Sequence, residues 1–381
     1  KIEFLNFDND IKIFGIGDKK EGYYFEEIEI TKINDDYIKP WLEFSDRFYW
    51  IKEKAQYSDL PIFAYQGKLF DEFKVKGFSG GYSLSSSENL KIDEITISNF
   101  DIKEFENIKK LINFDFIGDY EKNILSFILS MKFDKFYLSN ISFDGGLFLP
   151  FNTPLGDFTT YNDEYEYELP KNIIGEFEIT DWNELSFDKI LTKDLIIQQG
   201  ENQFSFNEFL IEEFKINTDF TYDLLKSKAS QQLLLNGDYS EIFNSFDKLD
   251  NFTISNLKII LNNLSFYSLD SFKIQNLIFD YFGNNKDIKV PVSLNFEING
   301  SQYNYMNLSN TYGIGTTFFD ILAYDLGYEQ VKLDFGAKWD WDTIENNINL
   351  GLNLGVKNAG SLELTTDIVD LDTNILNING S

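Results

Sequence analysis

The residues best suited to bind a ligand lie close together near the N-terminus. Trp41, Tyr49 and Trp50 stand there beside Glu43 and Arg47. Aromatic faces next to carboxylates can hold a sugar, because ring stacking and hydrogen bonds to hydroxyl groups complement each other. The alternative is that the rings fill a core and the arginine pairs with an acid at its edge, since large aromatics mainly supply buried area. We favour the core and keep Trp41, Tyr49 and Trp50 as candidate ligand-binding residues.

Acidic residues are too numerous to define a catalytic pair. With 63 Asp and Glu in 381 residues, carboxylates about 5–9 Å apart, as in glycosidases, are expected by chance. The stretch 157–168 and the pair Asp340 and Asp342 are therefore expected to form solvated acidic surfaces. Calcium is the one metal that this composition suits, because oxygen ligands abound. Asp8-Asn9-Asp10 lacks the EF-hand spacing and glycine, so the sequence locates no metal site.

Several classes of chemistry are excluded by composition. The chain has no histidine and no cysteine, which removes Ser-His-Asp and Cys-His catalysis, imidazole and thiolate metal ligands, and disulfides. No Gly-rich phosphate loop is complete, since Gly313-Ile314-Gly315 lacks a third glycine and a P-loop lysine. We therefore expect no catalytic residue and no cofactor, and expect that the protein is not an enzyme.

The net charge restricts the partners. Lys and Arg number 33 against 63 Asp and Glu, and 33 − 63 gives −30. Nucleic-acid binding needs clustered positive charge, so no nucleic-acid partner is expected. No apolar run reaches the ~18 residues that span a bilayer, so no transmembrane segment is expected in this chain. Its start at Lys1, with no signal-like segment following, indicates a processed or truncated chain.

A repeated apolar frame is the main structural signal. Alanine is scarce and aromatic residues make up 17% of the chain, which favours strands over helices. The frame is φ-x-x-φ-x-φ-x-x-φ-x-φ, where φ is apolar, and its second gap often ends in asparagine, as in Ser98-Asn99 and Ser255-Asn256. Copies begin at Ile92, Phe133, Phe206, Leu249 and Leu269, with weaker ones at Phe70 and Phe187.

The spacing inside each copy predicts strand with an irregularity. Apolar pairs at period two are typical of strands. A two-residue gap moves the next apolar pair to the opposite face, unless a bulge or bend turns the chain. Each copy is thus two short strands or one bent strand. Leucine-rich repeats have a similar spacing, but the copies here do not recur at the constant period of a solenoid.

Helices are expected to be few. Apolar spacing predicts helices over 119–131, near 222–246 and over 318–326. Beyond Lys289 the sequence predicts an antiparallel meander, with apolar alternation from Val331 and a turn at 342–347. The predicted fold is mainly β, an elongated antiparallel sheet or meander with a few short helices. We divide it into β-rich modules at 1–150 and 151–290 and a C-terminal meander module at 291–381, or one continuous elongated domain.

The C-terminal third resembles known envelope proteins. The run Leu326-Gly327-Tyr328, then Trp339-Asp340-Trp341-Asp342, then Gly360-Ser361-Leu362-Glu363-Leu364 looks like the C-terminal meanders of AsmA-like and YdgA-like bacterial envelope proteins. The upstream frame copies are similar to the long β-rich stretches of these families, so the likeness covers about half of the chain. It implies a periplasmic or membrane-tethered β scaffold linked to envelope lipids, and it transfers no catalytic residue.

These observations lead to one expected function and two alternatives. We expect a non-catalytic scaffold of the bacterial envelope, in the periplasm or at the cell surface, that handles lipid or another hydrophobic ligand. A self-assembling surface-layer or filament subunit is the first alternative, because unpaired strand edges favour self-association. A carbohydrate-binding or carbohydrate-cleaving protein is the second. The expected partners are therefore lipid or envelope components, or further copies of the chain.

Overall fold

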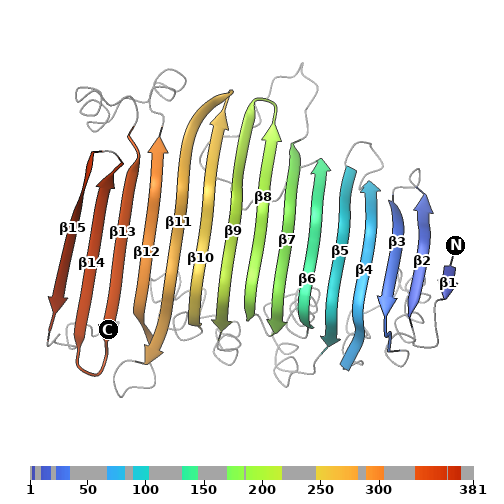
Figure 1. Cartoon of the computed structure of the whole chain (residues 1–381), viewed down its shortest axis with the longest axis horizontal. Helices are drawn as coiled ribbons and strands as arrows, with labels where there is room; N and C mark the ends of the chain where they lie inside the picture. The colour runs from blue at the N-terminus through green and yellow to red at the C-terminus, as the bar shows by residue number, and fades with distance from the viewer. Residues whose placement is uncertain are drawn as a thin grey trace, which may run out of the picture.

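The described part of the protein is one long antiparallel sheet. The computed structural model describes residues 2–4, 10–18, 23–34, 67–81, 89–102, 131–144, 170–183, 186–216, 246–281, 289–303, 331–357 and 359–369. They form 15 strands, each paired with the next one in sequence. Figure 1 shows the strands side by side, from β1 at one end of the sheet to β15 at the other. The prediction of a mainly β antiparallel meander is therefore confirmed.

Strand lengths change along the sheet. The first three are β1 (Ile2–Phe4), β2 (Ile11–Asp18) and β3 (Tyr23–Thr31). Long strands follow: β4 (Gly67–Gly81), β5 (Asn89–Ile102), β6 (Met131–Asp144), β7 (Lys171–Asn183), β8 (Phe187–Gln199), β9 (Asn202–Ile216), β10 (Phe246–Leu261), β11 (Leu264–Tyr281) and β12 (Lys289–Tyr303). The last three are β13 (Leu333–Asp342), β14 (Asn347–Val356) and β15 (Gly360–Ile368).

The predicted helices are not confirmed. The part of the chain that the structure describes contains no helix, and therefore none that could cross a membrane. The helices expected over 119–131, near 222–246 and over 318–326 lie outside the described residues, except at two ends. Met131 opens β6 and Phe246 opens β10, so the predicted helices extended too far there. Each of these residues stands two or three positions before a frame copy, which begins at Phe133 in β6 and at Leu249 in β10, and the period-two spacing prevails over the helical one.

A left-handed residue bends most of the long strands. Asn99, Asn140, Asn256 and Asn276 have φ between 48° and 52° inside strands β5, β6, β10 and β11. Each is the second residue of a two-residue gap in the apolar frame. Asparagine tolerates this conformation because its short polar side chain can hydrogen-bond locally. The bend returns the following apolar pair to the original face, so each frame copy is one bent strand.

From β3 to β11, each left-handed residue is preceded six positions earlier by a second residue of the pattern. In β5 these are Asp93 and Asn99, and in β6 they are Asp134 and Asn140. Because the strands are antiparallel, this earlier residue of one strand lies opposite the left-handed residue of the next strand. In the β5–β6 pair the registry stays constant across the bend, because Ser98 pairs with Lys135 on one side of it and Asp101 pairs with Lys132 on the other. In the β11–β12 and β12–β13 pairs the registry shifts at the bend.

These positions form two lines across the sheet, which we call bend rows. The left-handed residue of one strand lies in one row and that of the next strand lies in the other row. Row A contains Lys32, Asp71, Asn99, Asp134, Asp181, Asp188, Glu213, Asp250 and Asn276; row B contains Gly15, Glu26, Gly77, Asp93, Asn140, Gly175, Asp194, Asn207, Asn256, Asp270, Gly300 and Asp334.

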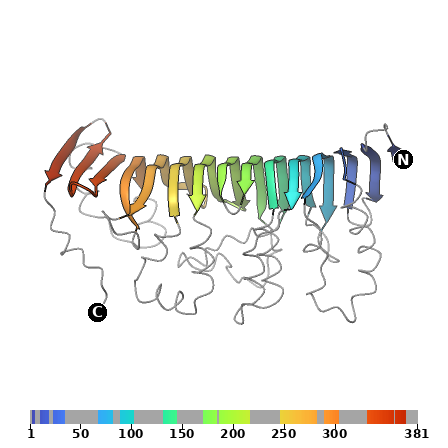
Figure 2. The same cartoon turned by 90° about the horizontal axis from the view of Figure 1, so that it is seen from below.

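The C-terminal strands depart from this pattern. Strands β13 and β14 contain no positive-φ residue, and their pairing is regular from Leu333 with Val356 to Asp342 with Asn347. The predicted turn between them is confirmed, because residues 343–346 connect the two strands. Figure 2 shows β13–β15 tilted away from the plane of the strands before them. The sheet therefore ends in a straight three-stranded section.

Candidate functional site

An apolar band runs across the sheet between the two bend rows. It consists of two cross-strand lines on one face, and Thr192 is its one polar member among the described residues. The first line is Ile13, Ile28, Val75, Ile95, Leu138, Phe177, Thr192, Phe209, Ile254, Phe272, Ile298, Phe335, Leu354 and Leu362; the second is Ile30, Phe73, Ile97, Phe136, Ile179, Ile190, Ile211, Phe252, Ile274, Phe296, Ala337, Leu352 and Leu364.

The band is long compared with a single ligand site. Neighbouring strands lie about 4.8 Å apart, so the band from β2 to β15 extends for roughly 60 Å. Exposure rises toward its C-terminal end: Val75 on β4 is 2% exposed, whereas Leu354 on β14 is 50% and Leu364 on β15 is 54% exposed. The band thus has a covered part and an open end.

Aromatic side chains reinforce one half of the band. The rings of Phe209, Phe252, Phe272, Phe296 and Phe335 contact in sequence edge to face, with centroid separations of 5.3, 5.7, 5.2 and 5.8 Å. Such arrangements add stabilisation beyond the buried area, because the ring edge is positive and the face negative. This line ties β9 to β13 across consecutive strands.

A second aromatic line lies outside bend row A. Trp182 stacks between Phe133 and Phe187, at centroid distances of 6.1 Å on both sides. Phe214 continues the line at 5.1 Å from Phe187, and Phe246 follows at 5.7 Å. The apolar face is therefore lined with rings on both sides of the bend row.

Lysines and acids alternate from strand to strand on the opposite face. Lys12 of β2 and Lys76 of β4 both contact Glu27 of β3, at 2.9 and 3.0 Å. Hydrogen bonds from the two lysines lower the pKa of Glu27 below its ordinary value. Lys74 continues the alternation with Glu94 of β5 at 2.8 Å. Because opposite charges across strands stabilise and like charges destabilise, the alternation favours this strand order.

The same alternation continues through the middle of the sheet. Glu178 of β7 accepts hydrogen bonds from Lys135 of β6, at 2.9 Å, and from Lys189 of β8. Burial acts to raise the pKa of Glu178, but the bonds from Lys189 and Lys135 outweigh it, and the pKa falls below its ordinary value. Lys193 contacts Glu176 at 2.7 Å. This face is a structural network of ion pairs.

Bend row A concentrates negative charge at its centre. Asp181 lies beside Asp188 and Asp134, and burial together with these two charges raises the pKa of Asp181. Lys215 contacts Asp188 at 3.0 Å and opposes the effect. Among the residues that the structure describes, no group of three or more acids is arranged to hold a metal ion. The described residues therefore indicate no position for the calcium ion that the composition would suit.

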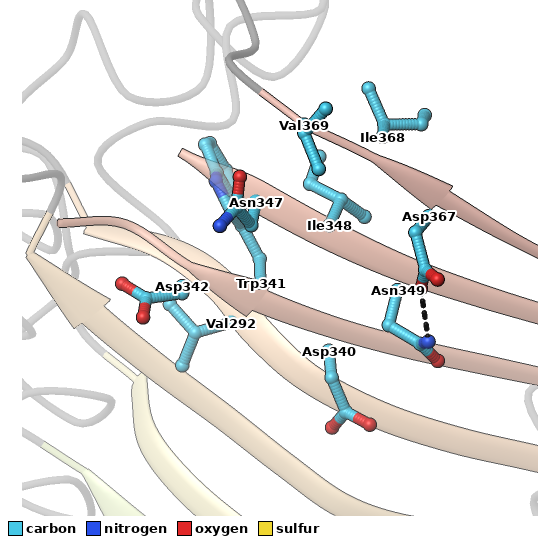
Figure 3. Close-up of a pocket in the computed structure, with 10 residues that line it drawn as sticks. All are labelled: Val292, Asp340, Trp341, Asp342, Asn347, Ile348, Asn349, Asp367, Ile368 and Val369. Atoms are coloured by element: carbon cyan, nitrogen blue, oxygen red, sulfur yellow. Dashed lines mark hydrogen bonds between the residues drawn. The ribbon is translucent and has the colours of Figure 1, made fainter. Parts of the chain in front are cut away.

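An open pocket of about 680 Å³ lies at the C-terminal end of the sheet. Asp340, Asp342 and Asp367 line it with Trp341 and Asn349 (Figure 3). Asp342 accepts hydrogen bonds from the backbone N–H groups of the following turn, at 2.9 and 3.0 Å. Asn349 donates to Asp367 at 2.6 Å, and Trp341 is only 8% exposed. The carboxylates of Asp342 and Asp367 thus hold the turn and the pairing of β14 with β15. The indole of Trp341 is too buried to stack on a ligand.

The residues predicted to bind a ligand are not placed. Trp41, Tyr49 and Trp50 lie outside the described residues, as does the acidic stretch 157–168. The apolar frame was predicted from the sequence, but the aspartates that lie opposite the left-handed residues in bend rows A and B were not. The signal was present, because Asp precedes Asn by six residues at Asp93 and Asp250.

Comparisons with known proteins give no match. No family model matches this chain, no curated protein matches it, and no solved structure matches it.

Proposed function

We propose that the protein is a non-catalytic β scaffold that holds lipid or another hydrophobic ligand against the apolar band. The observation that supports this most is the length of the band: a compact core needs no apolar line roughly 60 Å long across a single sheet. The increasing exposure toward Leu354 and Leu364 supports it too, since large exposed apolar patches mark interaction sites.

Charge defines which surroundings suit this function. With a net charge of −30, the protein is repelled by anionic surfaces within about a Debye length, ~8 Å at physiological salt. Contact with the hydrocarbon part of a ligand therefore fits better than contact with an anionic headgroup. We place the scaffold in the bacterial envelope or at the cell surface, where the resemblance of the C-terminal run also points.

Native mass spectrometry of protein purified without detergent tests the proposal. The expected result is a monomer carrying adducts of lipid mass. Ile254→Asn on the apolar band should reduce the adducts strongly, whereas Ser255→Asn, the next residue along β10, should retain them. Clean ligand-free masses for the unaltered protein, or equal adducts in both variants, would overturn the proposal.

A further inference from the structure

The terminal strand β15 differs from the other strands in exposure. Every residue from Gly360 to Ile368 is exposed, and β15 pairs only with β14 among the described strands. An open edge presents unpaired N–H and C=O groups, which can pair with another extended segment. Bulges, prolines and charged side chains, lysine above all, commonly block such an edge. The sequence of β15, GSLELTTDI, has no proline or lysine, its two charged residues are Glu363 and Asp367, and its pairing with β14 has no register shift.

The polar face of β15 carries acids without a lysine partner among the described residues. Glu363 faces Asn353, and Asp367 accepts a hydrogen bond from Asn349 at 2.6 Å. Elsewhere an acidic strand has lysines on its neighbours, as β3 has Lys12 on one side and Lys76 on the other. The alternation therefore calls for lysine beyond β15, opposite Glu363 and Asp367.

The apolar face of β15 defines the other half of the partner. Leu362 and Leu364 are each 54% exposed. A strand added at this edge would set its apolar side chains beside them and its lysines four residues apart on the other face, because side chains alternate along a strand. We propose that β15 is a docking edge for an extended segment of a partner protein, in which apolar residues alternate with lysines spaced four apart. This inference does not depend on the ligand of the apolar band.

A second copy of this chain fits the edge less well. If two β15 strands paired antiparallel about Thr365, Glu363 would face Asp367, and such like charges destabilise a sheet. Pairing about Leu364 would avoid this repulsion, but no register of two β15 strands sets a lysine opposite Glu363 or Asp367, because β15 contains none. At the other end, β1 has 3 residues against the 9 of β15. Charge complementarity therefore favours a different, lysine-bearing protein.

A designed peptide tests the docking edge. The probe is a labelled nine-residue peptide with valine at odd positions, lysine at positions two and six, and threonine at four and eight. Fluorescence anisotropy should show binding to the full chain, and a peptide with glutamate in place of lysine should bind about tenfold more weakly. Combining Glu363→Lys with Asp367→Lys should reverse this preference. Combining Glu201→Lys with Glu345→Lys, which makes the same change of charge in two turns, should leave it unaltered.

Backbone chemistry separates strand addition from simple charge attraction. Successive N–H groups of a strand point to opposite sides, so N-methylation of alternate residues blocks one edge of the peptide only. One of the two alternately methylated peptides should lose binding and the other should keep it. Hydrogen exchange should slow in β15 when the lysine peptide binds. Absence of binding, equal binding of both methylated peptides, or a dimer of the protein alone that Glu363→Lys and Asp367→Lys together abolish would overturn the proposal.

Discussion

Asn140 of β6 donates a hydrogen bond from Nδ2 to Oδ2 of Asp93 on β5, at 2.9 Å. The reciprocal bond occurs at the other end of the same strand pair, where Nδ2 of Asn99 donates to Asp134. Each Asp thus lies opposite the left-handed residue of its neighbour. Because both strands change direction at the same level, neither gains an extra residue, and the ladder continues in register. The six-residue spacing between Asp and Asn is therefore what keeps long bent strands paired.

Replacing a left-handed glycine of the bend rows by alanine should measurably lower the free energy of unfolding. Gly15 has φ +62° and open space within 4 Å of where a Cβ would lie, whereas Gly300 has φ +67° and Asp270 so close that a Cβ would overlap it. We expect Gly15→Ala to lower the free energy of unfolding by about 1 kcal/mol and Gly300→Ala by about 2 kcal/mol or more. Gly336→Ala, with ordinary φ and the nearest atom at 3.5 Å, should be near neutral. Urea unfolding measures all three, and equal losses would contradict the assignment.

The ion pairs of Glu178 should make stability depend on pH. Its pKa is lower in the folded state, so the pairs stabilise above the ordinary carboxyl pKa of about 4.3, and this stability is lost as pH falls through the folded pKa. Glu178→Gln should cost about 1–2 kcal/mol at pH 7, since its lysine partners are 42% and 32% exposed. The difference from the unaltered protein should shrink by pH 3. A pH-independent loss in urea titrations would exclude this origin.

Asp181 should behave in the opposite way. Its pKa is raised by burial and by Asp188 and Asp134, so stability falls as pH rises from the ordinary carboxyl pKa through the folded one. Asp181→Asn should therefore raise the unfolding midpoint at pH 7 and leave it nearly unchanged at pH 3. Asparagine also suits the φ of 53°. In Asp194→Asn, at φ 52° between Gly175 and Asn207, we expect no such gain. Equal responses would refute charge repulsion as the cause.

Ring contacts along the apolar band should be coupled. Phe252 and Phe272 meet edge to face at 5.7 Å. Replacing either by leucine should destabilise the fold by about 1 kcal/mol, and the double variant should lose less than the sum, with a coupling of about 0.5–1.5 kcal/mol. A double-mutant cycle by urea unfolding measures it. Phe252 with Phe335, which do not touch, serves as the control pair and should be additive within about 0.5 kcal/mol.

Sequence alone predicted much of the sheet but not its bends. Period-two spacing around Phe335 and Leu352 was enough to predict the C-terminal strands, because apolar residues occupy one face of each strand. The frame copy at Ile92 indicated an irregularity at Asn99, yet it left one bent strand and two short strands equally open. Deciding between them needs the neighbouring strand, since Asp134 is what keeps the bend in register. Such a contact between strands cannot be derived from one frame copy.

The candidate site was predicted in part for a similar reason. The apolar residues of each copy were visible, but their alignment into a single band depends on the registry of the thirteen strand pairs from β2 to β15. Trp41 drew attention because its residue type suits ligand binding, whereas Ile97 and Phe136 are ordinary core residues until their pairing is known. A site made from repetition has no distinctive residue that a motif search could find.

Pairing of each strand with the next one in sequence has an evolutionary consequence. Among the described strands, backbone pairing is confined to neighbours, so such a sheet can lengthen or shorten by inserting or deleting strands without rebuilding the rest, as in repeat proteins. The charge alternation limits this freedom. Lysines and acids alternate from strand to strand on the polar face, so loss of a single strand such as β3 would bring the lysines of β2 and β4 onto neighbouring strands, and like charges opposite each other destabilise a sheet. The unit of growth is therefore a hairpin, and related sheets should differ by even numbers of strands.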